Sequence, residues 1–553
     1  MARTHVEVLQ RVADADAKAE ASISMSNVLS YSDYDKLRDD EYSSDDIPTC
    51  ELNNFLLDGN TDIPDYLSTA NFGVWSNSLT DENGDFITNP VLTLTTSGSY
   101  STAGFTVTFW GDTWPKQTVT TWYNGTTVLG ASTDTCTGFT HFIDNAVNGF
   151  NKITIEFVGT DTPYRRVKIC EIDYGEIFSW TDNDIVSANV LEEVNLTSEE
   201  LTINTLDLTI HDASASFNML NPSGVYEYLQ QKQQFRVQGY VDGSIIPMGF
   251  YYLDTWENSS AVIAKFSAYS IIGVMDTVTY QTSSMWSSAT VSTIVASIMA
   301  VAGVTRYSID SGIASQTLSG YIPICTCREA LHYVCFAARA SCISKRDGSI
   351  KIIRLPSSET EIKIEKSQKM GDQSIKQNTL VNSVAVTAYA FTQSTDESDL
   401  YSEDSLDAGT YNITFDNPSV ISGISRGTLL SSGINFAKVQ LTSSGSLKIY
   451  GYEYNSSTTI YTVEASGLTD SKRSQATIDS IYLISKSNAQ SVAQFIYDDY
   501  QRRIVQDFEI AVTSEKIGDN VDVDTMLNYR KSGTITSLDM DLTGGFVAKC
   551  EVR

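Results

Sequence analysis

Four residues near the middle of the chain have side chains that could bind a metal ion. Cys325, Cys327, His332 and Cys335 carry thiols and an imidazole, which are ligands that Zn²⁺ prefers. Their spacing, C-x-C-x4-H-x2-C, differs from the paired C-x2-C knuckles of structural zinc sites. Cys335 also falls on the apolar stripe of a predicted helix, where a small buried cysteine is common. We therefore predict packing as the role of these residues, and no metal site.

A serine in the second half of the chain matches the pattern of a hydrolase nucleophile. Gly423-Ile424-Ser425-Arg426-Gly427 fits G-x-S-x-G, in which the serine lies on a sharp turn between a strand and a helix. In that arrangement a histidine base follows the serine in the chain. The four histidines all precede Ser425: His5, His141, His211 and His332. We interpret the match as chance and predict no catalytic residue.

Acidic side chains offer two further kinds of chemistry. A glycosidase needs two carboxylates on opposite sides of a sugar, but 68 acidic residues give too many pairs to select one. Asp81, Asn83 and Asp85 alternate like the first ligands of a calcium loop, yet the segment lacks the Gly and the terminal Glu of an EF-hand. Asn83-Gly84 is typical of a hairpin turn. A turn is the preferred interpretation, and a structural calcium ion stays an alternative.

Aromatic residues gather in the first third of the chain. An exposed aromatic ring can stack on a sugar, whereas a buried one contributes to a core. Core packing is the ordinary interpretation for this group, but several members lie near the ends of predicted strands or in turns. The candidates for a carbohydrate-binding site are Trp110, Trp114, Trp122 and Tyr123.

The balance of charge limits the possible partners. The chain has 68 acidic and 37 basic residues, for a net charge of -31. Affinity for nucleic acid depends mainly on neutralising phosphates, so a site that grips DNA is not expected. Passage of DNA along an acidic wall, without specific binding, is compatible with this charge.

The ends and the apolar segments give no sign of export or of a membrane span. The N-terminus lacks the continuous apolar region of a signal peptide, and the apolar segment 289–304 is too short to cross a bilayer. Eight cysteines in 553 residues do not form a disulfide framework. We expect a soluble protein made in a reducing cytoplasm.

The elements that must position these residues are mostly strands. Phe105, Val107 and Phe109 alternate with threonines, as in a half-buried strand, and similar segments follow at 119–123, 152–158 and 166–172. This spacing favours a sandwich. The block 286–355 is different, because it contains apolar residues at helical spacing over 291–302, closed by Gly303.

A second helix in that block begins with a clear signal. Thr326 and Glu329 have the spacing of a capping box, and an apolar stripe follows. Asp347-Gly348 then favours a two-residue type I′ turn between two short strands. The unit is a capped helix that leads into a tight hairpin.

Two parts of the chain resemble known families. The motif T-x-R-E-A-L-x5-A followed by a hairpin on R-D-G is similar to the middle segment of phage tail hub proteins, often labelled "prophage endopeptidase tail". The strands G-x-T-V-T-F-W, W-Y-N-G, N-K-I-T-I-E-F and Y-R-R-V-K-I-C-E-I-D-Y-G resemble galactose-binding-like jelly rolls. The hub resemblance covers most of residues 175–553.

These resemblances imply a mainly β protein, with multi-domain β-barrels, a β-sandwich and a small α/β segment. The implied domains are an N-terminal strand of the first hub barrel (1–30), a linker (31–49), a galactose-binding-like insert (50–177), the first barrel (178–285), a helix-helix-hairpin segment (286–355) and a second barrel (356–553) with an insertion at about 392–480.

The hub resemblance also implies a function and partners. The protein would be a homotrimer that closes the tail tube at the tip of a long-tailed phage or a tail-like particle, with DNA passing through the lumen. Its partners would be the distal tail protein, the tape measure protein and tail fibre or spike proteins, and the insert would bind a host cell-wall glycan or dock a neighbour. No cofactor is implied.

Two other functions remain open at this point. A tail-associated peptidase or polysaccharide depolymerase would have catalytic groups clustered in a cleft. A bacterial surface adhesin would need an export signal, which the N-terminus does not provide.

Overall fold

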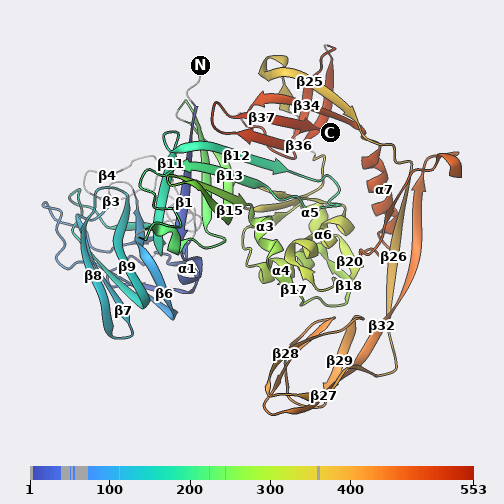
Figure 1. The fold of residues 1–553 in the computed structure, drawn as a ribbon, viewed down its shortest axis with the longest axis horizontal. Coiled ribbons are helices and arrows are strands. Elements are labelled where there is room, and N and C mark those ends of the chain that lie inside the picture. The colour runs from blue at the N-terminus through green and yellow to red at the C-terminus, as the bar shows by residue number, and fades with distance from the viewer. Residues whose placement is uncertain are drawn as a thin grey trace.

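The computed structural model describes residues 4–30, 32–38, 50–51, 54–55, 73–110, 113–222, 224–242, 244–357, 362–512, 514–527 and 529–553. Residues 39–49 of the predicted linker and 56–72 of the predicted insert lie outside this description. The predicted fold class is confirmed: the chain is mainly β, with several sheets and a small helical block. Figure 1 shows the insert on the left, the long sheet at the centre and top, and a narrow arm on the right.

One sheet of 13 strands organises the molecule. β1 pairs with β11 on one side and with β14 on the other, so the first strand of the chain joins strands that follow the insert. β24 (Ile362–Ile364) and β35 (Asn520–Asp524) branch from the main path at β36. The main path runs β11 (Gly175–Thr181), β1 (Thr4–Ala13), β14 (Gln234–Val241), β15 (Ser244–Ser260), β16 (Ile263–Tyr269), β13 (Thr205–His211), β12 (Ile185–Glu193), β36 (Arg530–Asp541), β37 (Val547–Val552), β34 (Ile504–Ala511) and β25 (Lys369–Gln377).

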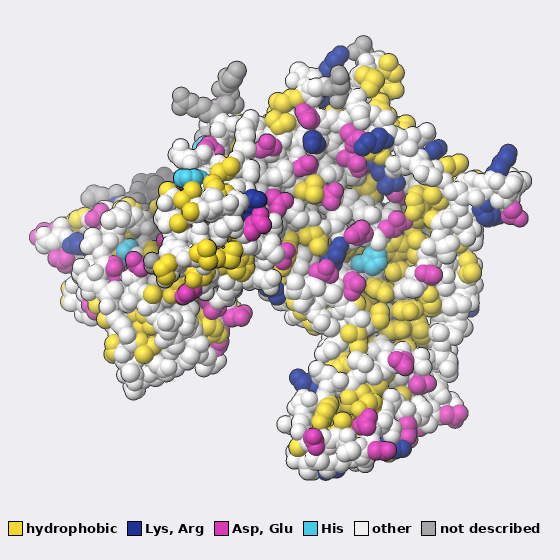
Figure 2. Space-filling model, in the orientation of Figure 1, with side chains coloured by type: hydrophobic (Ala, Val, Ile, Leu, Met, Phe, Trp, Pro, Cys, Tyr) yellow, Lys and Arg dark blue, Asp and Glu magenta, His cyan; other side chains and the backbone are white. Residues whose placement is uncertain are grey.

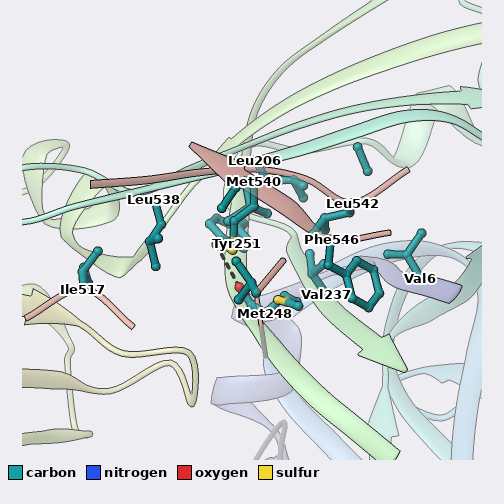
Figure 3. Packing of buried hydrophobic residues seen from close by; sticks show 14 of the residues in the cluster. Val6, Leu206, Val237, Met248, Tyr251, Ile517, Leu538, Met540, Leu542 and Phe546 are labelled. Carbon is teal, nitrogen blue, oxygen red and sulfur yellow. Dashed lines mark hydrogen bonds between the residues drawn. The ribbon is translucent and has the colours of Figure 1, made fainter. Parts of the chain in front are cut away.

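The pairing of β12 with β36 joins the two halves of this sheet, with a register from Asn189↔Asp541 to Glu193↔Ser537. The strands predicted for two barrels therefore belong to one sheet, and one hydrophobic core runs beneath both halves. Figure 3 shows Val6 and Val237 from the first half close to Phe546 from the second. A Cβ at Gly239 would lie 2.9 Å from the Phe546 ring, so this contact needs a glycine.

The insert has its own sheet and core. Residues before it contribute, because β2 (Ser22–Met25) pairs with β6, and Ala17 and Ala21 of the α1 region lie in the same core. The remaining elements of this region are α1 (Ala15–Glu20), η1 (Asp35–Arg38), β3 (Cys50–Glu51), β4 (Asn54–Phe55), β5 (Val74–Trp75), β6 (Val91–Phe109), β7 (Gln117–Asn124), β8 (Thr127–Thr135), β9 (Thr140–Val158) and β10 (Lys168–Asp173).

The helical block packs around α4 (Val291–Ala302) and α6 (Cys327–Ala338). Gly303 ends α4 with φ 69°, and the capping box of Thr326 and Glu329 is present at the start of α6, as expected. The other elements here are α3 (Ile271–Asp276), β17 (Thr279–Tyr280), β18 (Trp286–Thr290), β19 (Tyr307–Ile309), α5 (Ser311–Ala314), β20 (Thr317–Gly320), β21 (Cys325–Thr326), β22 (Ser341–Ser344) and β23 (Ile350–Ile353). Two short 3₁₀ helices belong to the long sheet instead: η2 (Val225–Tyr228) packs on its core, and η3 (Lys366–Gln368) follows β24.

The predicted type I′ turn at Asp347-Gly348 is wrong. Gly348 has φ 78°, but Asp347 is not among the residues with positive φ, which type I′ would require. The Gly348 N–H donates to the Lys345 carbonyl and the Lys345 N–H donates to the Ser349 carbonyl. The connection is therefore a three-residue loop, for which one left-handed residue suffices.

A long two-stranded arm leaves the helical block. β26 (Ser383–Gln393) pairs with the second half of β32 (Gly445–Glu464), and α7 (Ala489–Tyr500) packs at its base. The arm carries a tip domain, residues 394–453, with a separate small core. It consists of β27 (Ser398–Leu406), β28 (Gly409–Thr414), β29 (Ser419–Ile424), β30 (Thr428–Ser432), β31 (Phe436–Leu441) and the first half of β32; η4 (Asp470–Lys472) and β33 (Gln475–Ile478) follow it.

The helices have no transmembrane character: in the described part of the chain, none combines the length and the hydropathy needed to cross a bilayer.

Candidate functional site

The long sheet has one charged face that continues across both of its halves. Directly opposed residues on neighbouring antiparallel strands point to the same side. The register places Asp207, Asn189 and Asp541 in one row across β13, β12 and β36. A second row contains Asp539, Lys549 and Glu509 across β36, β37 and β34.

Acidic residues predominate on this face, which we call the acidic face. Its charged members on β15 to β34 are all exposed or half-buried, and they comprise eight carboxylates, Glu193, Asp207, Glu257, Asp507, Glu509, Asp539, Asp541 and Glu551, and two lysines, Lys265 and Lys549.

The other side of the same strands forms the core, with Leu206, Phe266, Leu538 and Met540 among the buried residues. Alternation along each strand thus separates a charged face from an apolar one, as the two-residue period of a strand requires.

Part of the acidic face is hollowed. A groove of about 870 Å³ lies between β12, β36, β37, β34 and β25. Its charged lining consists of five carboxylates, Glu193, Asp507, Glu509, Asp539 and Glu551, and three basic side chains, Lys376, Lys549 and Arg553. Burial and the neighbouring carboxylates of Glu551, Glu200 and Asp539 raise the pKa of Glu193. Carboxylates therefore outnumber basic groups in this groove. Figure 2 shows acidic side chains spread over the body, the insert and the tip domain, with fewer basic ones.

A buried ion pair fixes the helical block to the sheet. Arg346, from the loop after β22, binds Glu192 of β12 through Nε–Oε1 (2.7 Å) and Nη2–Oε2 (2.8 Å). The two side chains are only 6% and 2% exposed. A paired, bidentate geometry is what makes such burial tolerable, because an unpaired charge would lose its hydration without compensation.

A second buried charge cluster fixes the insert to the sheet. Arg11 of β1 binds Glu171 of β10 at 2.9 Å, and Lys18 of α1 binds Asp173 at 3.0 Å. Lys18 also lies 3.2 Å from Glu171. Two cations and two anions are thus matched, and the insert is held against the sheet by more than its two chain connections.

The four aromatic candidates do not form one platform. Trp122 is fully buried in the insert core against Phe105 and Phe150, so its assignment as a sugar ligand is corrected. Trp110, Trp114 and Tyr123 are half-buried. Trp114 precedes β7, and Tyr123 lies near the other end of that strand, roughly 20 Å from Gln117 at the rise of a strand. Whether any of these three binds sugar stays a prediction.

The cysteines and the histidine of the possible zinc set belong to the helical block. Cys327 and Cys335 are buried in its core, and His332 Nδ1 lies 2.8 Å from the Ser198 carbonyl oxygen. Burial raises the pKa of Cys325 to about 12 and that of Cys327 to about 11, whereas zinc binds thiolates. Within the described residues, no three acidic, His or Cys side chains are arranged as metal ligands.

Two other motifs have structural roles. Ser425 lies between strands β29 and β30, so the helix that must follow a nucleophile elbow is missing there, and its Oγ accepts a hydrogen bond from the Lys448 N–H. In the loop 81–85, Lys116 Nζ donates to the Asn83 carbonyl (2.6 Å) and to Asp85 (2.7 Å). This ammonium supplies the charge that a calcium ion would otherwise bring.

Three solved structures resemble this architecture. The tail protein from Neisseria meningitidis MC58 has 9% identity and a TM-score of 0.42, over 68% of this chain and 93% of its own. The 43 kDa tail protein of prophage MuSo2 from Shewanella oneidensis has 9% identity and a TM-score of 0.40, over 68% of this chain and 94% of its own. Prophage tail protein gp18 from Listeria monocytogenes EGD-e has 9% identity and a TM-score of 0.37, over 68% of this chain and 90% of its own.

Neither a protein-family model nor a curated protein matches the sequence. All three of these structures are described as tail proteins, the class that the sequence resemblance named. Identities of 9% and TM-scores below 0.5 say nothing about what this chain binds. The likeness of residues 50–177 to galactose-binding-like modules stays a prediction.

Sequence patterns alone missed the acidic face and the two buried ion clusters. The signal for the acidic face was present in L-D-M-D-L (538–542) and D-F-E-I (507–510), where acidic and apolar residues alternate. Nothing in the sequence indicated that these strands lie beside β12 and β13, because about 340 residues separate β12 from β36.

Proposed function

We propose that the protein is a structural hub at the tip of a phage tail or a phage-tail-like particle, acting as a homotrimer. The observation that carries this proposal is the single sheet that spans both halves of the chain, with a core on one side and the acidic face on the other. Three such sheets arranged around an axis would form a collar with six similar halves, which suits the end of a tail tube.

In this arrangement the acidic face lines the lumen. Eight carboxylates against two lysines repel the phosphate backbone, so DNA passes without being held. The outer partners would be the distal tail protein, the tape measure protein and tail fibre or spike proteins. The insert would point outward and either bind a host cell-wall glycan or dock one of these neighbours.

The state of assembly tests this proposal. Mass photometry should give a particle three times the 60.8 kDa of one chain, and electron microscopy should show a ring with a central opening. A lone monomer at all protein concentrations, or a compact trimer without an opening, would contradict it.

The role of the insert needs a separate experiment. We expect the full-length protein to bind some cell-wall sugars on a glycan array, and Trp114→Ala to weaken that binding if Trp114 stacks on the sugar. Uniform silence across the array would favour docking to a neighbouring tail protein.

We also propose that the protein acts by assembly and not by catalysis. The alternative, a cell-wall-degrading peptidase or depolymerase, predicts soluble fragments after incubation of the purified protein with host cell wall. Release of such fragments would overturn this part of the proposal.

A further inference from the structure

Two arginines lie side by side at the C-terminal end of α6. The Arg354 Nε donates to the Arg339 carbonyl (3.1 Å), and its Nη2 donates to the Ala338 carbonyl (3.4 Å). The Arg339 Nη2 donates to Gln316 (3.0 Å). The hydrogen bonds of both guanidinium groups thus go to neutral oxygens, and neither group forms an ion pair with a carboxylate in the described part of the chain.

Helix capping explains only part of this arrangement. A cation near the last carbonyls of a helix is favourable, and Arg354 fills that role. Arg339 has φ 58°, a left-handed conformation that glycine adopts more easily, and its Nε is buried without a hydrogen-bond partner. Burial and the charge of Arg354 lower the pKa of Arg339. A bound anion would compensate the repulsion between the two guanidinium groups.

The surroundings of the pair are unusually basic for this protein. Segment 286–355 has seven basic residues, Arg306, Arg328, Arg339, Lys345, Arg346, Lys351 and Arg354, against three acidic ones, Asp310, Glu329 and Asp347. The whole chain has the opposite balance, 37 basic to 68 acidic. Arg346 pairs with Glu192 and Arg328 pairs with Asp276, two carboxylates outside this segment, so the positive charge that an acidic partner would meet is that of Arg339 and Arg354.

The tip domain offers the complementary charge. Residues 394–453 contain eight acidic residues and three basic ones, and Figure 2 shows several acidic side chains on this domain. Within β27, Glu403 and Asp404 are exposed, and neither takes part in an ion pair among the described residues. The register shifts between Glu403 and Leu406, a bulge that breaks the regular alternation beside these two carboxylates.

The arm keeps these carboxylates away from the arginines of the same chain. The tip domain touches the body where the Ile434 N–H donates to the Ser283 carbonyl (3.0 Å), whereas β27 lies at the far, lower end of the domain (Figure 1). In a homotrimer, a second copy of the chain would present the same carboxylates on its own arm.

We propose that Arg339 and Arg354 form a carboxylate-binding site, occupied by Glu403 and Asp404 of a second copy of this chain. Two guanidinium groups would meet two carboxylates, and the arm of one protomer would be fixed on the helical block of the next. This inference rests on the proposed homotrimer.

Covalent trapping provides a direct test. In the full chain, Arg354→Lys keeps the positive charge and adds an amine that a carbodiimide can join to a nearby carboxylate. Isotopically heavy and light protein are mixed, reassembled and treated. We expect a heavy–light cross-linked peptide that joins position 354 to the segment containing Glu403 and Asp404. Cross-links confined to single chains, or none at all, would overturn the proposal.

Charge reversal provides a second test, which needs no cross-linking reagent. Arg354→Glu should weaken assembly about tenfold or more, and Glu403→Lys with Asp404→Lys in the same chain should restore it. Lys486→Glu, an exposed change of the same charge at the base of the arm, should have no effect. Equal weakening by the control, or no rescue, would contradict the pairing.

The outcomes separate this inference from the proposed function. A ring that forms normally but yields no cross-link between chains would remove the inference alone. Protein that stays monomeric would remove both. A further outcome is that inorganic phosphate binds at Arg339 and Arg354 and no cross-link forms between chains. That result would identify a site for free anions and overturn the assignment to the arm.

Discussion

At the scale of single residues, the pair of Arg346 and Glu192 connects the helical block to the centre of the long sheet. Both side chains are almost fully buried, and the two hydrogen bonds between them match one charge to the other. The contribution of such a pair is seen best when one partner is removed, since the remaining charge is then buried without compensation.

We therefore expect Arg346→Met to lower the free energy of unfolding by about 3–5 kcal/mol. The double variant with Glu192→Leu should recover much of this loss, because neither side chain is then charged. Urea denaturation followed by tryptophan fluorescence would measure both. Similar stability of Arg346→Met and the wild type would show that water reaches Glu192.

Glu176 predicts a pH dependence. Burial and the nearby Asp144 raise its pKa from 4.5 to about 7, so the folded protein holds a proton that the unfolded chain releases between these values. Stability should therefore fall as the pH rises through this interval. Glu176→Gln should remove this contribution to the loss of stability at rising pH. The melting temperature of the variant should exceed that of the wild type at about pH 8 but not at about pH 5. Parallel pH profiles would contradict this.

At the scale of elements, the start of α6 depends on one side chain. Thr326 accepts from the Glu329 N–H (3.1 Å) and donates to Asp276 (2.9 Å), while Glu329 accepts from the Thr326 N–H. Thr326→Ala should cost about 1 kcal/mol, the usual value of an N-cap, and Thr326→Ser should cost less. Thermal denaturation of the two variants would test this, and equal losses would mean that the hydroxyl contributes little.

The tip domain should be removable. It has its own core, and Gln393 and Tyr454 are direct partners across the arm. Replacing residues 394–453 by Asn-Gly would close the arm as a hairpin. We expect the melting temperature of the rest to stay unchanged while assembly weakens, as the arm contact requires. Unfolding of the body would show that the domain supports it.

At the scale of the whole molecule, the acidic face should keep the affinity of the assembled protein for DNA low. Asp207→Lys, Asp539→Lys and Glu551→Lys together should create affinity for duplex DNA, with a salt slope steeper by about 0.9 for each phosphate contacted. Fluorescence anisotropy at several salt concentrations would measure it. As a control, lysines at Glu82, Asp161 and Asp498 should have little effect on DNA binding. Binding of DNA by the wild type would contradict an acidic lumen.

Much of the local structure was determined by the sequence itself. The helix at 291–302 with Gly303, the capping box at Thr326 and the strand around Phe105 follow from propensity, capping and a two-residue period, which act over a few residues. The same local rules misjudged the turn at Asp347, because three-residue and two-residue loops share their preference for Gly348.

Only the tertiary structure decided which segments meet. The pairing of β12 with β36, the burial of Trp122, and the closeness of Arg339 to Arg354 all depend on contacts between distant or separately folded parts of the chain. A strand pattern specifies which residues face a core but not which strand lies beside it, and charge counts do not tell which face the charges share. The acidic face and the arginine pair therefore became visible only once the register of the sheet and the end of α6 were known.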